Sequence, residues 1–389
     1  MDGLCDALAM RVLVATTAGV GHFGPMVPFA QACRAAGHDV VVAAPRSFEP
    51  AVVAAGLAFA PLGEPSPAEL GAIFGRLEGL TLDEANVIVL REVFAGVDAR
   101  AALPALSALV DRWAPDVILR ELAEFASFVV AESRRIPQIN VAIGLESFDA
   151  FAYPLLDEPL ERLGVTGGPD ALSALPRVSL APHSLEDPKV RLSARTDRYC
   201  DPALTEMGDE QLPDWWEADG DPLVYVSFGS TVGTGGMFPD LYRSVALAVA
   251  DLPVRVLMTV GRGNDPEALG TLPRNVHVER WWPQAEVMPH AALTVGHGGW
   301  GTTLATLAAG VPMVLLPLFA LDQHYNADRV EAVGAGVTLA GGLDAIKRVP
   351  AAVQEVLGGA HTVSARLIRD EIVALDSTEN FPGTLSDLT

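Results

Sequence analysis

Two histidines stand in glycine-rich turns, where an imidazole ring has room to act on a ligand. His22 lies in residues 19–24, of sequence GVGHFG, and His297 lies in residues 296–303, of sequence GHGGWGTT. An imidazole takes up or releases a proton near neutral pH, and its N–H groups donate hydrogen bonds to anions. A lone histidine is more often structural than catalytic, so both interpretations of His22 stay open at this point.

An anion site is predicted around His297. Residues 292–295 form a short apolar run that ends at the glycine turn, and apolar residues then recur at helical spacing, which predicts a strand, a turn and a helix. Glycines let the backbone approach a ligand, and the N–H groups at the start of a helix favour an anion such as phosphate. The groups that would meet it are Gly298, Gly299, Gly301 and the hydroxyls of Thr302 and Thr303. A second predicted strand, 312–316, brings Asp322 and Gln323 to the same edge.

Both turns also fit G-x-G-x-x-G, the fingerprint of dinucleotide-binding oxidoreductases. That interpretation requires an acidic residue about twenty positions further on, at the end of the second strand. Here that strand ends in AAPRS, with Arg46 and no carboxylate. An NADP-dependent oxidoreductase with Arg46 on the phosphate remains an alternative, although it leaves the stretch from Trp281 to Arg329 unexplained.

The elements that must position these residues form two series of alternating strands and helices. The predicted strands are 11–17, 39–45, 57–63, 115–121 and 136–143 in the first half, and 222–231, 254–261, 276–281, 292–299 and 312–318 in the second. Helices are expected near 238–250, 300–309, 321–333, 345–357 and 361–374. This alternation predicts doubly wound parallel sheets in two domains, with a cleft between the carboxyl ends of their strands. Residues 64–100 look less regular, and such insertions usually shape the ligand site.

The domain boundaries follow from the breaks in this pattern. Between residues 181 and 220 the alternation gives way to sequence rich in Pro, Asp and Arg. We expect a disordered leader over 1–9, a first domain over 10–200, a linker over 201–220 and a second domain over 221–389.

Composition limits the partners and the compartment. The chain has 389 residues, 50% of them hydrophobic, a mean hydropathy of +0.30 and a formal charge of −23, so we expect a globular protein with two cores. This charge repels nucleic acid and anionic membranes on average. Cys5, Cys33 and Cys200 form no C-x-x-C pair, which argues against a disulfide framework or a zinc site and favours a reducing cytoplasm. No apolar run reaches the length of a membrane span, and residues 1–9 lack the basic region of a secretory signal.

Four short motifs stand in register in the C-terminal half. They are WWPQ (281–284), HGGWGTT (297–303), GVPMVLLP (310–317) and DQHYNADRV (322–330). Together, over about fifty residues, they resemble the nucleotide-sugar signature of the family 1 GT-B glycosyltransferases, which include the enzymes that glycosylate macrolide, glycopeptide and enediyne antibiotics. The resemblance implies an α/β protein of GT-B fold, with two Rossmann-like domains facing a central cleft. It also implies that the last helix packs back on the first domain.

The resemblance implies an inverting, metal-independent glycosyltransferase in which His22 is the general base for the acceptor hydroxyl. A carboxylate normally orients such a histidine and stabilises its imidazolium form. Glu121, at the end of a predicted strand, and Glu124, one helical turn further on, are the candidates, and the sequence does not separate them. Solvated surface carboxylates are the alternative for either residue.

The donor site is also implied by the resemblance. Trp281 would stack on the nucleobase, with the backbone of Trp282 and the amide of Gln284 at the base edge. Neighbouring residues of a strand point to opposite sides, so the two tryptophans cannot both face one core. The remaining implied contacts are Ser230, Thr231, His297, Gly298, Gly299 and Thr302 for the diphosphate, and Asp322 and Gln323 for the sugar hydroxyls. Plant relatives carry a glutamate for the ribose diol where this chain has Ala305, which favours a thymidine diphosphate (TDP) sugar.

No metal or other cofactor is expected. Asp219-Gly220-Asp221 has the D-x-D spacing by which other glycosyltransferases hold Mg²⁺ or Mn²⁺, but it directly precedes a strand and so lies at the wrong edge of the sheet. We interpret it as a turn. The start of the helix after His297, together with His297 itself, would neutralise the leaving diphosphate instead.

We expect the acceptor in the N-terminal half, against residues 64–100 and 144–156. The candidate contacts are Phe74, Leu77, Phe94 and Phe148, with Leu80, Phe151 and Tyr153 beside them. Some of these residues must be core, because amphipathic helices with aromatic faces usually are. Few basic residues accompany them, which favours a hydrophobic, uncharged aglycone. The resemblance to antibiotic-tailoring enzymes implies a bacterial polyketide or enediyne-type product that receives a deoxysugar.

Two further alternatives share the fold. A nucleotide-sugar epimerase would turn over the donor without an acceptor, and a catalytically silent helper subunit would bind a partner transferase. Intact His22 and His297 argue against the helper. A homodimer is one assembly that the sequence leaves open.

Overall fold

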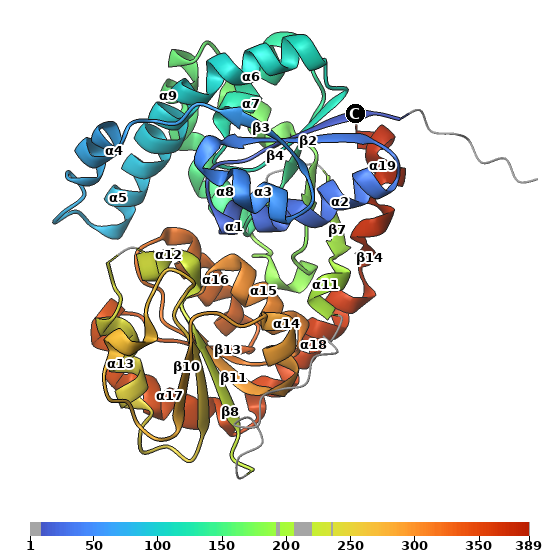
Figure 1. The fold of residues 1–389 in the computed structure, drawn as a ribbon. Coiled ribbons are helices and arrows are strands. Elements are labelled where there is room, and N and C mark those ends of the chain that lie inside the picture. The colour runs from blue at the N-terminus through green and yellow to red at the C-terminus, as the bar shows by residue number, and fades with distance from the viewer. Residues whose placement is uncertain (1–8, 192–194, 206–219, 235, 389) are drawn as a thin grey trace, which may run out of the picture. The chain divides into compact units, whose positions relative to one another are not determined.

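The computed structural model describes residues 9–191, 195–205, 220–234 and 236–388, which form two compact units (Figure 1). The first unit contains the chain up to Ser179, Lys189–Tyr199 and the segment from Asp376 onward, and the second contains Leu180–Pro188 and Cys200–Leu375. Residues 1–8 of the expected leader and 206–219 of the expected linker lie outside the described residues.

The first unit is built on a sheet whose described strands have the order β14-β7-β6-β5-β4-β1-β2-β3. The strands are β1 (Arg11–Ala15), β2 (Asp39–Pro45), β3 (Ala58–Leu62), β4 (Val117–Arg120), β5 (Gln138–Val141), β6 (Arg177–Ser179), β7 (Thr196–Cys200) and β14 (Asp376–Ser377). From β3 to β7 the neighbouring strands are parallel. Val12, Leu13 and Val14 on β1 are fully buried, which is the pattern of a parallel strand covered on both faces.

Helices connect these strands. They are α1 (Val20–Phe23), α2 (Val27–Ala35), α3 (Glu49–Ala54), α4 (Pro67–Phe74), α5 (Leu82–Ile88), the π-helix η3 (Val89–Asp98), α6 (Ala99–Trp113), α7 (Phe125–Arg134), α8 (Glu146–Ala152), α9 (Asp157–Arg162), α10 (Gly168–Ala174) and α19 (Phe381–Leu388). The chain's last helix, α19, packs on α2, where the rings of Phe29 and Phe381 meet edge to face with centroids 5.1 Å apart.

The sheet of the second unit repeats the strand order β3-β2-β1-β4-β5-β6 of the first. Its described strands are β8 (Leu223–Ser227), β9 (Arg255–Thr259), β10 (Val276–Glu279), β11 (Ala291–Gly296), β12 (Met313–Leu315) and β13 (Gly336–Thr338), in the order β10-β9-β8-β11-β12-β13 and all parallel. Its helices are α11 (Pro202–Thr205), α12 (Gly229–Thr234), α13 (Asp240–Ala248), α14 (Gln284–Val287), α15 (Trp300–Ala308), α16 (Leu321–Ala332), α17 (Val349–Leu357) and α18 (Ala360–Ala374). The prediction of doubly wound parallel sheets is confirmed.

Both sheets have a switch point, where the strand order reverses. It lies between β1 and β4 in the first unit and between β8 and β11 in the second. In open α/β sheets, ligands bind outside the carboxyl ends of the strands at this point. The turn that carries His22 follows β1, and the turn that carries His297 follows β11, so each histidine stands at one switch point.

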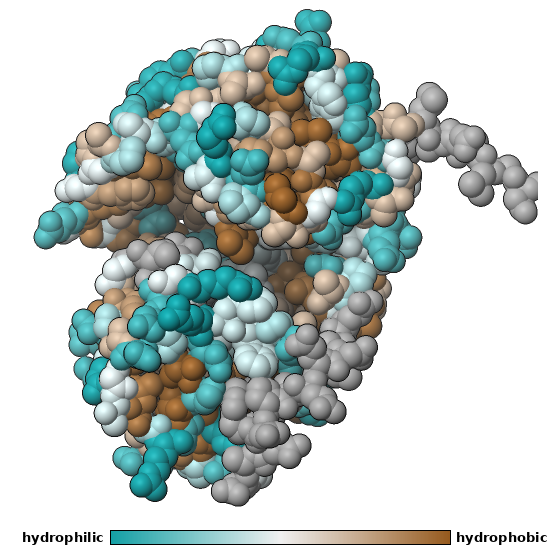
Figure 2. Space-filling view, viewed as in Figure 1, coloured by the Kyte–Doolittle hydropathy of each residue, from teal (hydrophilic) through white to brown (hydrophobic). Residues whose placement is uncertain are grey.

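The expectation of irregular structure over residues 64–100 is wrong, because most of this stretch is helical. Capping boxes begin α4 at Ser66 and α5 at Thr81, where the carboxylates of Glu69 and Glu84 accept hydrogen bonds from the backbone N–H groups of the two cap residues. The helix then continues without a break as Leu82–Trp113. Its length and apolar composition would suit a membrane span, so the expectation that no apolar run is long enough is wrong. Half of its most apolar stretch is buried inside the protein. Figure 2 shows apolar side chains gathered in the region of α4 and α5.

The stretch 181–220 also holds more regular structure than its composition indicates. Its described part contributes β7 to the first sheet and α11 to the second unit. Leu180–Pro188 belongs to the second unit, where Arg329 Nε donates to the carbonyl oxygen of Leu185 at 2.9 Å.

Candidate active site

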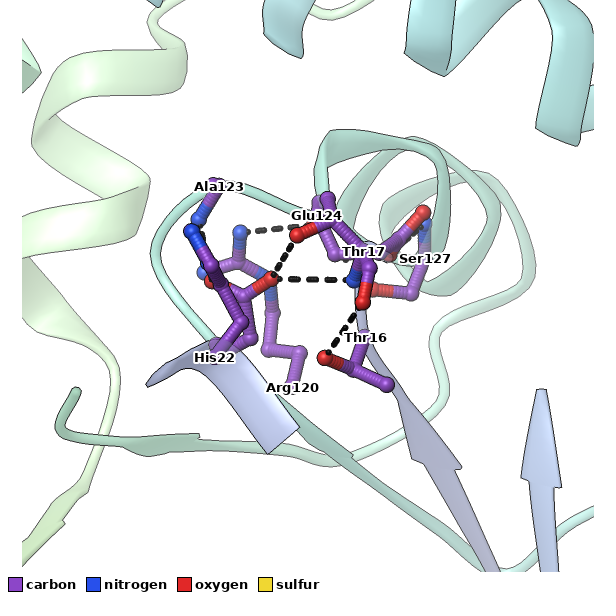
Figure 3. A network of polar contacts seen from close by, with 8 residues as sticks. Thr16, Thr17, His22, Arg120, Ala123, Glu124 and Ser127 are labelled. Carbon is purple, nitrogen blue, oxygen red and sulfur yellow. Dashed lines mark hydrogen bonds and ion pairs between the residues drawn. The ribbon is translucent and has the colours of Figure 1, made fainter. Parts of the chain in front are cut away.

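His22 and Glu121 meet at the switch point of the first sheet. Figure 3 shows His22 among its polar neighbours, with Thr17 and Ala123 close by. β1 and β4 are hydrogen-bonded neighbours, so the turns that follow them lie side by side. The imidazole Nδ1 of His22 lies 3.2 Å from Oε2 of Glu121. The His22 side chain is 26% exposed, whereas that of Glu121 is fully buried. A buried carboxylate thus holds one nitrogen of a ring that solvent can reach.

The carboxylate of Glu121 is held ionised by donors around it. Oε1 accepts hydrogen bonds from the backbone N–H and the hydroxyl of Thr17, both at 3.2 Å, and Oε2 accepts from the N–H of Ala123 at 2.6 Å. Burial alone would raise the pKa of Glu121, but the charge of His22 and these hydrogen bonds outweigh it and lower the pKa. An ionised partner fixes the Nδ1–H tautomer of His22 and leaves Nε2 as the basic nitrogen.

Glu124 caps a helix, so its hydrogen bonds distinguish it from Glu121, the other candidate that the sequence left open. Its carboxylate caps α7, accepting from the N–H groups of Ala126 at 3.1 Å and Ser127 at 2.8 Å. Figure 3 draws Glu124 beside Ser127. Burial raises the pKa of Glu124 in spite of these bonds. Arg120, which is fully buried, donates from Nη2 to the backbone oxygen of Glu124 at 2.8 Å and so steadies the loop that carries Glu121.

Asp98 joins this group and was missed in the sequence. It is half-buried at the end of η3, and its charge interacts with those of Glu124, His22 and Glu121. Burial, reinforced by the charge of Glu124, raises the pKa of Asp98 to about 6. Its spacing of four residues from Phe94 was a signal, but only once residues 82–113 are recognised as one helix.

The predicted acceptor residues lie on several elements of the first unit. Phe94 packs against His22, with ring centroids 5.7 Å apart. Phe74 is 49% exposed at the end of α4, and Leu77 after it is half-buried. Phe148 on α8 is half-buried and stacks on Phe151, with centroids 6.2 Å apart.

Tyr153 belongs to the core instead, and so does not fit the acceptor role. It is 3% exposed, and its hydroxyl accepts a hydrogen bond from the amide of Asn140 at 3.1 Å. Leu80 lies at the other extreme, 38% exposed just before the cap of α5.

His297 stands at the switch point of the second sheet, buried between two glycines. A Cβ added at Gly229 would lie 2.9 Å from its ring, and one added at Gly299 would lie 2.3 Å from it. Burial lowers the pKa of His297 to about 4, so the ring is neutral near pH 7. Its Nδ1 has no hydrogen-bond partner among the described residues. Without a bound anion the ring is therefore uncharged, and the expectation that His297 helps to neutralise a diphosphate stays a prediction.

The turn after His297 lies so close to the backbone of Gln323 that position 298 has no room for a side chain. Gly298 has φ +85°, and a Cβ there would lie 2.6 Å from the backbone oxygen of Gln323. Asn326 donates to the carbonyl of Gly298 at 2.8 Å and fixes the turn. Gly299 is the N-cap of the nine-residue helix α15, and no side chain of the described residues caps the helix's first N–H groups. These groups stand where an anion is expected.

The two adjacent tryptophans have different surroundings. Trp282 is half-buried against a cluster that includes Tyr225 and Met288. Trp281 is 48% exposed, and the guanidinium carbon of Arg262 lies 3.7 Å from the centroid of its ring. An exposed indole of this kind can stack on a nucleobase.

The remaining predicted donor residues lie on α12, α14, α15 and α16. Gln284 donates to the hydroxyl of Thr302 at 3.2 Å, so one side chain of the expected base edge contacts one of the expected phosphate turn. Ser230 is exposed on α12, and Thr231 follows it there. Asp322 is half-buried in the first turn of α16.

Gln323 and Ala305 are both buried. Oε1 of Gln323 accepts from the N–H of Leu318 at 2.9 Å, so this side chain holds the loop before α16. Ala305, on α15, has only a methyl group where the plant relatives carry a glutamate. Asp219 of the D-x-D motif lies outside the described residues.

The chain is similar to known proteins over most of its length. Residues 31–222 match the family described as erythromycin biosynthesis protein CIII-like, N-terminal domain, and residues 207–364 match the UDP-glucoronosyl and UDP-glucosyl transferases. L-demethylnoviosyl transferase of Streptomyces niveus is 34% identical over 373 residues, which cover 93% of this chain and 94% of that protein. This chain is a family 1 glycosyltransferase.

Further relatives support the assignment of this chain to the glycosyltransferases. TDP-daunosamine transferase DnrS of Streptomyces peucetius is 30% identical over 373 residues, covering 85% of each chain. The crystal structure of SsfS6, a glycosyltransferase of Streptomyces sp. SF2575 complexed with thymidine diphosphate, is 26% identical with a TM-score of 0.73, and covers 97% of this chain and 99% of that one. The GT-B fold of the glycosyltransferase is therefore confirmed. The oxidoreductase, epimerase and helper alternatives gain no support from these relatives.

Proposed function

We propose that this glycosyltransferase moves a deoxysugar from a TDP-sugar to a hydroxyl of a hydrophobic natural-product aglycone, with inversion at the anomeric carbon. The observation that carries the proposal is the 3.2 Å contact between Nδ1 of His22 and Oε2 of Glu121 at the switch point of the first sheet. A solvent-reachable imidazole held by a buried carboxylate is the usual arrangement of a general base.

The proposed reaction is a single displacement. Glu121 keeps the proton of His22 on Nδ1, so Nε2 takes the proton of the acceptor hydroxyl. The hydroxyl oxygen bonds to the anomeric carbon while the bond from that carbon to the diphosphate oxygen breaks, and TDP leaves with the electron pair. Attack on the face opposite the leaving group inverts the anomeric configuration.

The second unit supplies the groups for the donor. The free N–H groups at the start of α15 and the imidazole of His297 are placed to donate hydrogen bonds to the diphosphate. Bound phosphate charge would favour the protonated ring, so donor binding would raise the pKa of His297 from about 4. Trp281 offers an exposed ring for the base. Buried Ala305 offers nothing to a ribose 2′-hydroxyl, in keeping with the thymidine nucleotides named for DnrS and SsfS6.

The first unit supplies the acceptor wall. Phe94 packs beside His22, and the exposed Phe74 and Leu80 extend the apolar surface along α4 and toward α5. A lipophilic aglycone, of the polyketide or enediyne type, would bury its rings against such a surface. Cys33 and Cys200 are buried free thiols, which fits a soluble enzyme of a reducing cytoplasm. A homodimer stays a prediction, to be checked by light scattering.

The experiment is a screen of TDP-sugars against a panel of aglycones, read by the mass shift of one added sugar. We expect transfer to lipophilic hydroxylated aglycones, and the coupling constant of the anomeric proton in the product to report inversion. Calorimetry with the two free nucleotides should give tighter binding of TDP than of uridine diphosphate. Transfer only to sugars or peptides, a retained configuration, or equal nucleotide affinities would each contradict the corresponding part of the proposal.

A further inference from the structure

Asp98, the last residue of the π-helix η3, is a carboxylate whose charge interacts with His22. Residues along η3 and its continuation divide between two packing neighbours: Leu90, Ala95 and Ala99 share a cluster with Phe125 and Phe128 of α7, and Val93 and Val97 share another with Ile73 of α4. Phe94 has its ring 5.7 Å from the imidazole of His22. Residues four apart on a helix lie on one side, so Asp98 lies on the side of η3 that faces His22.

Asp98 differs from the two glutamates nearby in what surrounds its charge. Glu121 accepts hydrogen bonds from Thr17 and Ala123, and Glu124 accepts from the first turn of α7. Asp98 makes no hydrogen bond or ion pair within the described chain, yet it is half-buried. No local donor therefore offsets its negative charge. Because the group is partly shielded from water, its electrostatic interaction with neighbouring groups is screened less than at an exposed site.

In the described part of the chain, the charge of Asp98 interacts with three titratable groups: Glu124, His22 and Glu121. The fully buried Arg120 binds the backbone of Glu124 and offsets part of the charge of that glutamate. His22 is the one group of the three that gains a positive charge when it accepts a proton.

We propose that Asp98 is a second carboxylate for the base, whose negative charge stabilises the imidazolium that forms when His22 takes the acceptor proton. This rests on the proposed function, because it assigns proton uptake to His22. The proton moves from the acceptor oxygen to Nε2, and Asp98 takes up none of it. Asp98 is thus a positioning residue that makes His22 a stronger base, in addition to Glu121, which fixes the ring's tautomer.

The test compares wild type with Asp98→Asn, which keeps the shape and removes the charge. Since burial raises the pKa of Asp98 to about 6, the wild-type carboxylate is ionised above that pH and protonated below it. We expect kcat/KM of wild type to exceed that of the variant by roughly 3- to 10-fold at about pH 8, and the two values to agree within about twofold near pH 5. Asp98→Glu should restore most of the difference at high pH.

The matched control is Asp83→Asn, which removes an exposed carboxylate of α5 in the same helical segment and should leave the rate unchanged at every pH. A purely structural role of Asp98 would lower the rate by the same factor across the pH range. That result, or an unchanged rate, would overturn the proposal. The Kd for TDP should not change in either variant.

A second measurement does not depend on turnover. In NMR spectra of ¹⁵N-histidine-labelled protein, the titration midpoint of His22 should move to lower pH in Asp98→Asn by roughly half a unit to one unit. In wild type the same resonances should report the ionisation of Asp98 near pH 6 as a second inflection. An unmoved midpoint and a single inflection would overturn the inference even if transfer is observed. If the protein transfers no sugar while the midpoint moves, the proposed function fails and the charge coupling stands.

Discussion

Nδ1 of His22 lies 3.2 Å from Oε2 of Glu121, although 99 positions separate the two residues in the chain. The contact exists because β1 and β4 are parallel neighbours, so that the turns at their carboxyl ends converge. The second unit repeats this relationship, since Gly229 follows β8, His297 follows β11, and the imidazole packs against that glycine. Each histidine is thus placed by the switch point of its own sheet.

The first prediction concerns the partner of the base. Glu121→Gln keeps the shape but replaces an acceptor with an amide that donates to Nδ1, which places the ring's proton on Nε2 and removes the basic nitrogen. We expect kcat to fall on the order of 10²–10⁴-fold with unchanged folding. Steady-state kinetics and circular dichroism measure the two. A rate within a few-fold of wild type would show that Glu121 does not set the tautomer.

Glu124 should affect stability more than turnover, because it caps α7. Glu124→Ala removes the acceptor for the N–H groups of Ala126 and Ser127 and should lower the free energy of unfolding by about 1–2 kcal/mol. Denaturant titration measures this loss. Because the cap also stabilises the loop that carries Glu121, we expect a few-fold loss of kcat as well. A loss of kcat as large as that of Glu121→Gln would contradict the division of roles between the two glutamates.

Much of this architecture could be predicted from the sequence, and the failures have physical causes. β2 begins and ends at the predicted residues, since a buried parallel strand is a continuous apolar run with turn residues at each end. The stretch 64–100 was misjudged, because its glycines and prolines conceal two capping boxes and a long helix. Asp98 could not be found without that helix. Glu121 and Glu124 share residue type and neighbourhood, and they are distinguished only by contacts that the fold creates: that of Glu121 with His22 and those of Glu124 with α7.

His297 should make stability depend on pH. Its pKa is lowered by burial to about 4 in the folded protein, against an ordinary value of 6.5, so between these values the unfolded state binds more protons. Stability is therefore fully present above pH 6.5 and is lost as the pH falls toward 4, by about 3 kcal/mol in total. His297→Gln should flatten this dependence in thermal or denaturant unfolding.

The matched control for that measurement is His183→Gln, which changes an exposed histidine of the same unit. This variant should keep the wild-type slope of stability against pH. Saturating TDP should reduce the loss, because a bound anion favours the protonated ring and brings the folded-state pKa of His297 closer to its ordinary value. An identical slope in wild type and His297→Gln would mean that His297 is not buried in its neutral form.

Trp281 should contribute to donor binding through its exposed face. Trp281→Ala removes the ring on which a base would stack and should weaken TDP binding by roughly 5- to 100-fold in calorimetry. Trp282→Phe, a change in a half-buried ring of the same motif, should mainly lower stability. If the two variants bind TDP as wild type does, the nucleobase lies elsewhere.

The central claim is that His22 takes the proton of the acceptor, and His22→Ala tests it most directly. The measurement is kcat with a TDP-sugar and an accepted aglycone, together with the Kd for TDP of the same preparation. We expect kcat to fall by roughly 10²–10⁴-fold while the Kd for TDP stays unchanged, because the donor groups lie in the second unit. A variant that keeps the wild-type kcat would contradict the assignment of His22 as the base.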